Sequence, residues 1–300
     1  MNEYQAFYEM VKKWTVSDYQ TPKIKSEVII DMLISEFIEE IISYGISHDA
    51  PPNLHLIAKE FPISRVGQDK LRHKGDSPTN GDTRQYASVD FLLTDSKDKP
   101  TTLYFVELKT TDDSFDGKQL LNMLWTCNQG TASLYHRFYD LIKYHVEQKK
   151  GKKTHRIKYK YMLEKMYKKQ EQSNHHINTD GIEMLLLDGL EKWENDIDCK
   201  FVYLSLNDNK LDIEALIKKG KGELTKTQQG KIVDVDFKTL SNNYKHPTTP
   251  LISLKWMDDG FVDYLKRKDA KDKTCKHMAW LGVKEILSLL ERVLLSYQKM

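Results

Sequence analysis

The chain has 300 residues, of which 39% are hydrophobic and 30% are charged, with a formal net charge of +2. This composition is typical of a globular protein with a substantial core, and no apolar run approaches the roughly 20 residues of a membrane-spanning helix. The cysteines Cys127, Cys199 and Cys275 are far apart and form no CxxC pair, which argues against a structural zinc site and favours a cytoplasmic protein. The first residues mix acidic and basic side chains, so no secretory signal is expected.

The first predicted element is a helix over residues 26–44, with Ser26 as its N-cap and Gly45 just past its end. Apolar residues recur along it at helical spacing and predict one buried stripe. Residues 48–64 are predicted to be a loop region. The Gly, Asn, Asp, Ser and Pro content of residues 72–84 predicts an exposed loop.

A β-hairpin is predicted next, with strands at about 87–94 and 102–109 joined by a polar turn. A helix is expected to begin near Asp116, with a break at Gly130.

In the second half of the chain, apolar residues predict further strands at 200–206 and 250–256. Between them, the charged, glycine-bearing stretch 218–231 is expected to be mobile. Residues 143–169 are rich in Lys and Arg with interleaved Tyr and His, which suits either a phosphate-binding face or a solvated helix. The pattern of residues 281–297 predicts an amphipathic C-terminal helix.

Three charged residues stand inside the apolar hairpin strands. Glu107 and Lys109 are two residues apart, so they emerge on one face of their strand, and Tyr104, Val106 and Leu108 take the other. In the preceding strand, Asp90 shares a face with Leu92, and the opposite face is predicted for Val89, Phe91 and Leu93.

Hairpin pairing would bring Asp90 beside Glu107 and Lys109, where two carboxylates repel each other unless a cation lies between them. Carboxylate oxygens and water are the ligands of Mg²⁺ or Mn²⁺. The other interpretation is a cross-strand ion pair on an exposed face.

Asp90 followed by Glu107-Leu108-Lys109 resembles the signature of the PD-(D/E)XK nuclease superfamily, although Val89 stands where many members have proline. The resemblance implies an α/β, restriction-endonuclease-like core: a mixed central β-sheet flanked by helices. Nothing in the sequence looks like a linker between two cores, which favours one elaborated nuclease domain over residues 1–300. Its expected parts are a core (about 24–130 plus 180–265), a helical basic insertion (about 131–179) and a C-terminal helix (about 275–299).

The resemblance also implies Mg²⁺-dependent nuclease chemistry, with Mn²⁺ able to substitute. Asp90, Glu107 and the main-chain carbonyl of Leu108 would bind the metal, and Lys109 would position the attacking water. A glutamate on the first helix assists in many members. Glu27 matches that position best and Glu40 is second, whereas Glu39 is predicted to point away from the buried stripe; a carboxylate favoured by the helix dipole explains Glu27 equally well.

The resemblance implies Gln119 as a substrate contact, and an ordinary surface glutamine is the other interpretation. Lys118 beside it, and Arg84 and Ser88 just before Asp90, are further candidate phosphate contacts of low specificity. Exonuclease-type members often place a tyrosine four residues after such a glutamine, but this chain has Met123 there. That difference favours an endonuclease of the restriction or phage-defence type.

The expected partner is DNA, with RNA left open and no membrane contact, and the loop at 72–84 and the basic segment 143–169 would hold the phosphate backbone. A homodimer would let two sites cut both strands, although the sequence shows none. The alternative function is a catalytically inactive nuclease-fold module that binds nucleic acid or a partner protein.

Overall fold

The central element of the fold is a mixed β-sheet. The computed structural model describes residues 26–67, 87–96, 100–109, 115–130, 134, 138, 157–159, 197–206, 211–231 and 251–297. In this part of the chain, five strands form one sheet in the order β1-β2-β3-β4-β5. Pairing is antiparallel between the first three and parallel from β3 to β5. The strands are β1 (His55–Ile63), β2 (Ala87–Thr94), β3 (Thr102–Lys109), β4 (Asp198–Ser205) and β5 (Leu251–Ser253).

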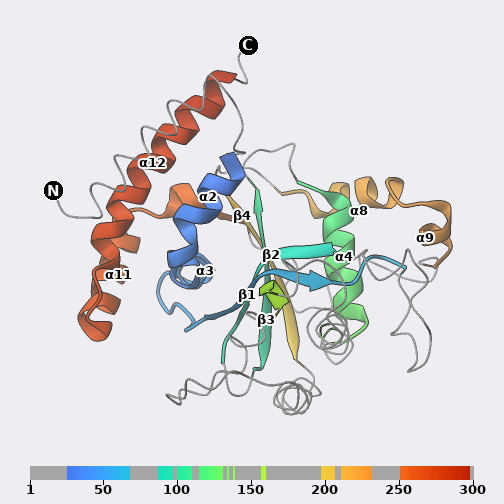
Figure 1. Cartoon of the computed structure of the whole chain (residues 1–300), viewed down its shortest axis with the longest axis horizontal. Helices are drawn as coiled ribbons and strands as arrows, with labels where there is room; N and C mark the ends of the chain where they lie inside the picture. The colour runs from blue at the N-terminus through green and yellow to red at the C-terminus, as the bar shows by residue number, and fades with distance from the viewer. Residues whose placement is uncertain are drawn as a thin grey trace.

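Helices cover both faces of this sheet (Figure 1). One face packs against α2 (Ser26–Ile34), η2 (Ser35–Phe37), α3 (Ile38–Ile46), α11 (Asp259–Asp272) and α12 (Lys276–Tyr297). The other face packs against α4 (Gly117–Asn128) and α8 (Ile213–Gly222), with α9 (Lys226–Lys231) beyond them. A short 3-10 helix, η6 (Leu254–Trp256), follows β5. The prediction of an α/β fold with a mixed sheet between helices is therefore confirmed.

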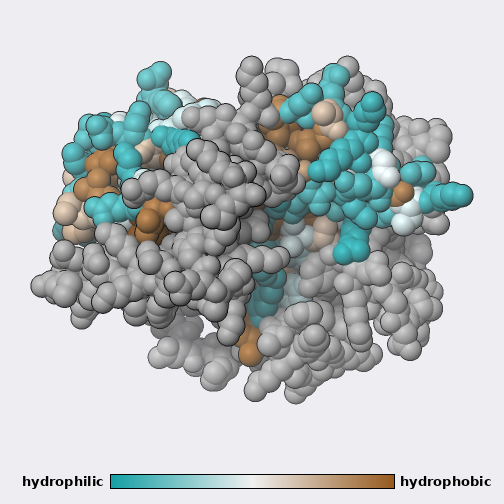
Figure 2. All heavy atoms as spheres, turned by 90° about the horizontal axis from the view of Figure 1, so that it is seen from above, coloured by the Kyte–Doolittle hydropathy of each residue, from teal (hydrophilic) through white to brown (hydrophobic). Residues whose placement is uncertain are grey.

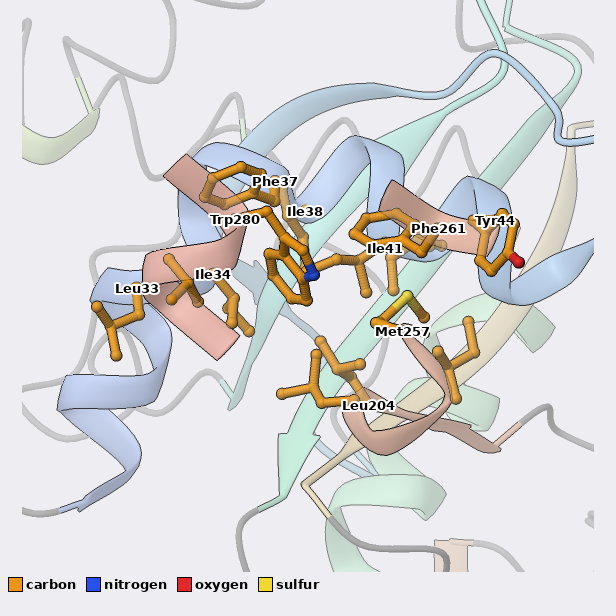
Figure 3. Packing of buried hydrophobic residues seen from close by; sticks show 14 of the residues in the cluster. Leu33, Ile34, Phe37, Ile38, Ile41, Tyr44, Leu204, Met257, Phe261 and Trp280 are labelled. Carbon is orange, nitrogen blue, oxygen red and sulfur yellow. The ribbon is translucent and has the colours of Figure 1, made fainter. Parts of the chain in front are cut away.

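The C-terminal helix α12 joins the N-terminal helices in one apolar layer. The indole of Trp280 is fully buried and lies edge-on to Phe37 at 5.2 Å and to Phe261 at 5.0 Å between ring centroids. Figure 3 shows these rings together with the aliphatic side chains of α2 and α3. The predicted C-terminal helix is confirmed. No helix in the described part of the chain, α12 included, has the length and apolar character needed to cross a membrane.

The hairpin strands and the start of the following helix are as predicted. Asp116 is the N-cap of α4, where its side chain accepts hydrogen bonds from the backbone N–H groups of Lys118 and Gln119. The predicted helix over 26–44 is instead interrupted by η2 and continues to Ile46. Gly45 is thus inside α3, and a side chain there would collide with Ile252 of β5.

Three other expectations were wrong. Strand β1 lies within 48–64, which was predicted to be a loop region. Pro62 is tolerated because β1 is an edge strand of the described sheet. The stretch 218–231 contains the end of α8 and the whole of α9 rather than a mobile segment. Only three residues of 250–256 are strand, because the chain turns into η6 after Ser253.

Strand β2 departs from simple alternation at Asp90. The prediction that Val89 shares a face with Phe91 is wrong, because Phe91 packs on the α2–α3 face and Val89 packs with Phe61 on the α4 face. The paired register of β2 with β3 begins only at Phe91, and the neighbouring strand β1 has an irregular residue, Glu60, with φ of 47°. Asp90 therefore lies where β2 separates from β3, and its side chain is not confined to ladder geometry.

Helices α4 and α8 touch backbone to backbone at two glycines. A Cβ built on Gly117 would lie 2.5 Å from the backbone nitrogen of Gly220 and 2.9 Å from its Cα. Since main-chain atoms cannot move aside easily, neither position has room for a side chain. This contact fixes the beginning of α4 against the end of α8.

We expect Gly117→Ala or Gly220→Ala to lower the free energy of unfolding by about 1–3 kcal/mol, because overpacking displaces the two helices. Gly222→Ala is the matched control, since a Cβ at this position of α8 meets no atom within 4 Å. Urea unfolding of the three variants measures the difference. Equal stability of all three would contradict the close packing of α4 on α8.

Candidate functional site

Two oppositely charged side chains are buried together at the end of β3. Glu107 is 2% exposed and Lys109 is 6% exposed, on the sheet face that α4 covers. The Lys109 Nζ donates to Glu107 Oε1 over 2.8 Å. An exposed surface ion pair, the alternative drawn from the sequence, is therefore excluded, and burial makes the geometry of this pair energetically important.

Gln119 completes the hydrogen bonding of this pair. It lies in the first turn of α4, where the Asp116 cap holds the backbone. Its Oε1 accepts from Lys109 Nζ over 2.9 Å, and its Nε2 donates to Glu107 Oε1. The predicted substrate contact Gln119 is thus bonded to both charged residues of β3, so it holds their relative position.

Asp90 reaches the same place from β2. Its Oδ2 accepts a hydrogen bond from the backbone N–H of Leu108 over 2.7 Å. In a strand, the N–H and C=O groups of one residue point the same way, so the Leu108 carbonyl also faces Asp90. The structure therefore brings Asp90, Glu107, Lys109 and the Leu108 main chain together.

The Glu107 carboxyl has a raised proton affinity. Burial above all, together with the charge of Asp90 and hydrogen bonding to Asp90, raises its pKa from the usual 4.5 to about 8. Lys109 opposes this rise through its charge and its hydrogen bond. The two carboxyl groups are therefore close enough to compete for one proton, which is the arrangement that a bound cation relieves.

The second carboxylate oxygen of Glu107 is available to bind another ligand. Glu107 Oε2 is buried, and no hydrogen-bond partner for it is found among the described residues. A buried carboxylate oxygen without a donor is costly unless an ion or water occupies the space beside it. Asp90, Glu107 and the Leu108 carbonyl are oxygen ligands of the kind that Mg²⁺ prefers, so these residues fit the ion.

The ligand set is small. Within the described ranges, no group of three or more His, Cys, Asp or Glu side chains could hold a metal. Mg²⁺ is commonly bound by one or two carboxylates, with water and substrate phosphate as its other ligands. Two carboxylates and a carbonyl are consistent with such an open site.

Glu39 and Glu40 of the first predicted helix are bonded to groups outside the site. Glu40 is buried on the α2–α3 side of the sheet, where its Oε1 lies 3.0 Å from the Nζ of Lys276 and 3.6 Å from that of Lys268. Glu39 was expected to point away from the core, but its Oε1 accepts from the backbone N–H of Leu56 over 2.7 Å. Glu27 lies in α2, and its side chain is outside the described residues.

The remaining predicted substrate contacts are dispersed. Ser88 lies on β2 opposite Pro62 of β1, two residues before Asp90. Lys118 lies in the first turn of α4, next to Gln119. Arg84, the loop at 72–84 and nearly all of the basic segment 143–169 are outside the described residues. Within that segment, Lys158 forms an ion pair with Glu60 of β1.

Two residues near the site were not predicted from the sequence. They are Tyr203 of β4 and Asp116, whose charge acts on Tyr203. Tyr203 pairs with Glu107 in the parallel register of β3 and β4, so both side chains are on the α4 face. Burial, followed by the charges of Glu107 and Asp116, raises the pKa of Tyr203. The signal in the sequence was Tyr203 and Ser205 at alternate positions of an otherwise apolar strand.

Comparisons with protein-family models, with curated proteins and with solved structures give no match for this chain. The interpretation of the site therefore rests on its own chemistry.

The raised pKa of Glu107 predicts a pH-dependent stability. The folded protein keeps a proton on Glu107 up to about pH 8, whereas the unfolded chain releases it near pH 4.5. Without added metal, the free energy of unfolding should therefore fall between about pH 5 and pH 8, by about 2–4 kcal/mol from this group. Urea unfolding in EDTA at several pH values measures this slope.

Glu107→Gln is the control for this measurement, because glutamine keeps the shape and the accepting oxygen but has no proton to lose. The variant should show a flatter dependence of stability on pH over the same range. Identical slopes in the two proteins would show that Glu107 is not the responsible group.

Proposed function

We propose that this protein is a Mg²⁺-dependent nuclease that hydrolyses phosphodiester bonds of DNA, with a restriction-endonuclease-like core. The observation that carries the proposal is the convergence of Asp90, Glu107 and Lys109 at the end of β3, with one buried oxygen of Glu107 left without a partner. The order of elements supports it as well. An antiparallel hairpin leads into a helix and then a parallel strand, the arrangement that the resemblance to the PD-(D/E)XK superfamily implies.

Each residue has a role that follows from its position. Asp90, Glu107 and the Leu108 carbonyl would hold the ion. A Mg²⁺ ion bound there would neutralise the two carboxylates and stabilise negative charge on the reacting phosphate. Lys109 places an ammonium group 2.8 Å from Glu107 Oε1, so its N–H groups can hold the attacking water and stabilise developing charge. Gln119 holds the Lys109 ammonium in place through its side-chain oxygen.

A basic surface beside the site supports a polyanionic substrate. The close contact of Gly117 with Gly220 places the last turn of α8 next to the first turn of α4, which carries Lys118 and Gln119. Lys219 and Lys221 are exposed in that last turn. Figure 2 shows hydrophilic side chains gathered on the side of the molecule where α8 and α9 lie. Such a surface suits the phosphate backbone of nucleic acid.

The endonuclease mode and a role in restriction or phage defence rest on the resemblance. The position at which exonuclease-type members often carry a tyrosine is occupied by Met123, which is fully buried in the core. That side chain is therefore not presented to a substrate. Internal cutting of DNA is the mode that we propose.

The direct test is cleavage of plasmid and linear DNA with Mg²⁺, Mn²⁺ or EDTA. We expect metal-dependent cutting, reduced at least about 100-fold by Lys109→Ala, because the variant loses the cation beside the reacting phosphate. Lys200→Ala is the matched control. Lys200 is also on a strand, but its Nζ lies over the ring of Tyr104 at 5.5 Å, on the opposite face of the sheet from Lys109.

Metal-independent cutting, or equal cutting by wild type and Lys109→Ala, would refute the proposed mechanism. DNA binding without any cutting, unchanged by Lys109→Ala, would instead identify the inactive nuclease-fold module as the correct function. Cleavage of RNA but not DNA would retain the site and change the substrate.

A further inference from the structure

The side chain of Tyr203 forms part of the wall around Glu107. It is fully buried, and its ring meets the ring of Phe115 edge-on at 5.4 Å between centroids. Because Tyr203 and Glu107 are partners in the parallel register of β4 and β3, their side chains leave the same face of the sheet side by side. Phe115 directly precedes the Asp116 cap of α4. The phenol therefore lies in the space between β3, β4 and the beginning of α4.

The hydroxyl of Tyr203 is a buried donor whose acceptor is missing. No hydrogen-bond partner for this hydroxyl is found among the residues that the structure describes. Burial and the neighbouring charges of Glu107 and Asp116 raise its pKa well above 10.0, so the group stays protonated. A phenylalanine would fill the same space without an unsatisfied polar group, which makes the hydroxyl unexplained by packing alone.

The neighbouring Glu107 has one carboxylate oxygen without a donor among the described residues. Its Oε1 accepts from Lys109 and Gln119, whereas its Oε2 has no partner in the described structure. The other charged neighbour, Asp116, already uses Oδ1 to cap the N–H groups at the start of α4. A protonated phenol and an unbonded carboxylate oxygen on adjacent strands are complementary groups.

We propose that Tyr203 is a further positioning residue of this site, whose hydroxyl donates to the Glu107 carboxylate through one water, since the two groups form no direct hydrogen bond. The proposal rests on the proposed function, because a fixed Glu107 oxygen matters most where it binds a metal ion. Partners of this kind orient a metal-binding carboxylate and strengthen it as a ligand, and losing one typically weakens metal binding about 10–100-fold.

The test is Tyr203→Phe, which removes only the hydroxyl oxygen. One readout is the pKa of Glu107 in the protein without metal, measured by ¹³C NMR of labelled glutamate carboxyl groups. The second is Mn²⁺ affinity by calorimetry. We expect the pKa of Glu107 to rise, because the charged form loses a donor, and Mn²⁺ to bind about 10-fold more weakly.

Tyr104→Phe is the matched control, because Tyr104 is a buried tyrosine of β3 on the opposite sheet face, in the cluster with α2 and α3. It should leave both readouts unchanged. An unchanged Glu107 pKa together with unchanged Mn²⁺ affinity in folded Tyr203→Phe, checked by its unfolding midpoint, would overturn the proposal. If the wild-type protein neither binds Mn²⁺ nor cuts DNA, the proposed function fails. The change in the Glu107 pKa in Tyr203→Phe still decides whether the Tyr203 hydroxyl interacts with the Glu107 carboxylate.

Discussion

The electrostatic cost of burying Glu107 and Lys109 is the constraint on which the site depends. A carboxylate and an ammonium group inside a sheet–helix interface are tolerated only when their hydrogen bonds are nearly complete. Lys109 and Gln119 satisfy one oxygen of Glu107, and the other oxygen has no partner in the described part of the chain. The nearby charge of Asp90 makes that second oxygen harder to keep ionised without a cation.

The rest of the fold positions the groups that interact with this buried pair. Strand β2 separates from β3 before Phe91, which lets Asp90 turn to the Leu108 N–H. Asp116 caps α4 and thereby sets the position of Gln119. The apolar layer that contains Trp280 packs against the opposite face of the sheet. Leu108 is one of the buried residues of this layer. A precise site thus follows from local irregularities within an ordinary α/β framework.

The sequence predicted the parts of this arrangement that depend on local patterns. Alternation along β3 predicted that Glu107 and Lys109 share a face, and the start of α4 near Asp116 was also predicted. Strand β1 was missed because its signal was obscured by Pro62 and by flanking loop residues, while pairing with β2 decides its conformation. Tyr203 was missed because only the register of β3 with β4, a long-range contact, places it beside Glu107. The pairing of Glu40 with α11 and α12 depends on long-range packing in the same way.

The most direct measurement is a crystal structure of the protein soaked with Mn²⁺, with anomalous diffraction to locate the ion. We expect one anomalous peak in coordination contact with Asp90 and Glu107, with Lys109 still beside the carboxylates. A structure in which Glu107 keeps its bonds to Lys109 and Gln119, and no peak lies near either carboxylate at saturating Mn²⁺, would contradict a metal-dependent hydrolytic site.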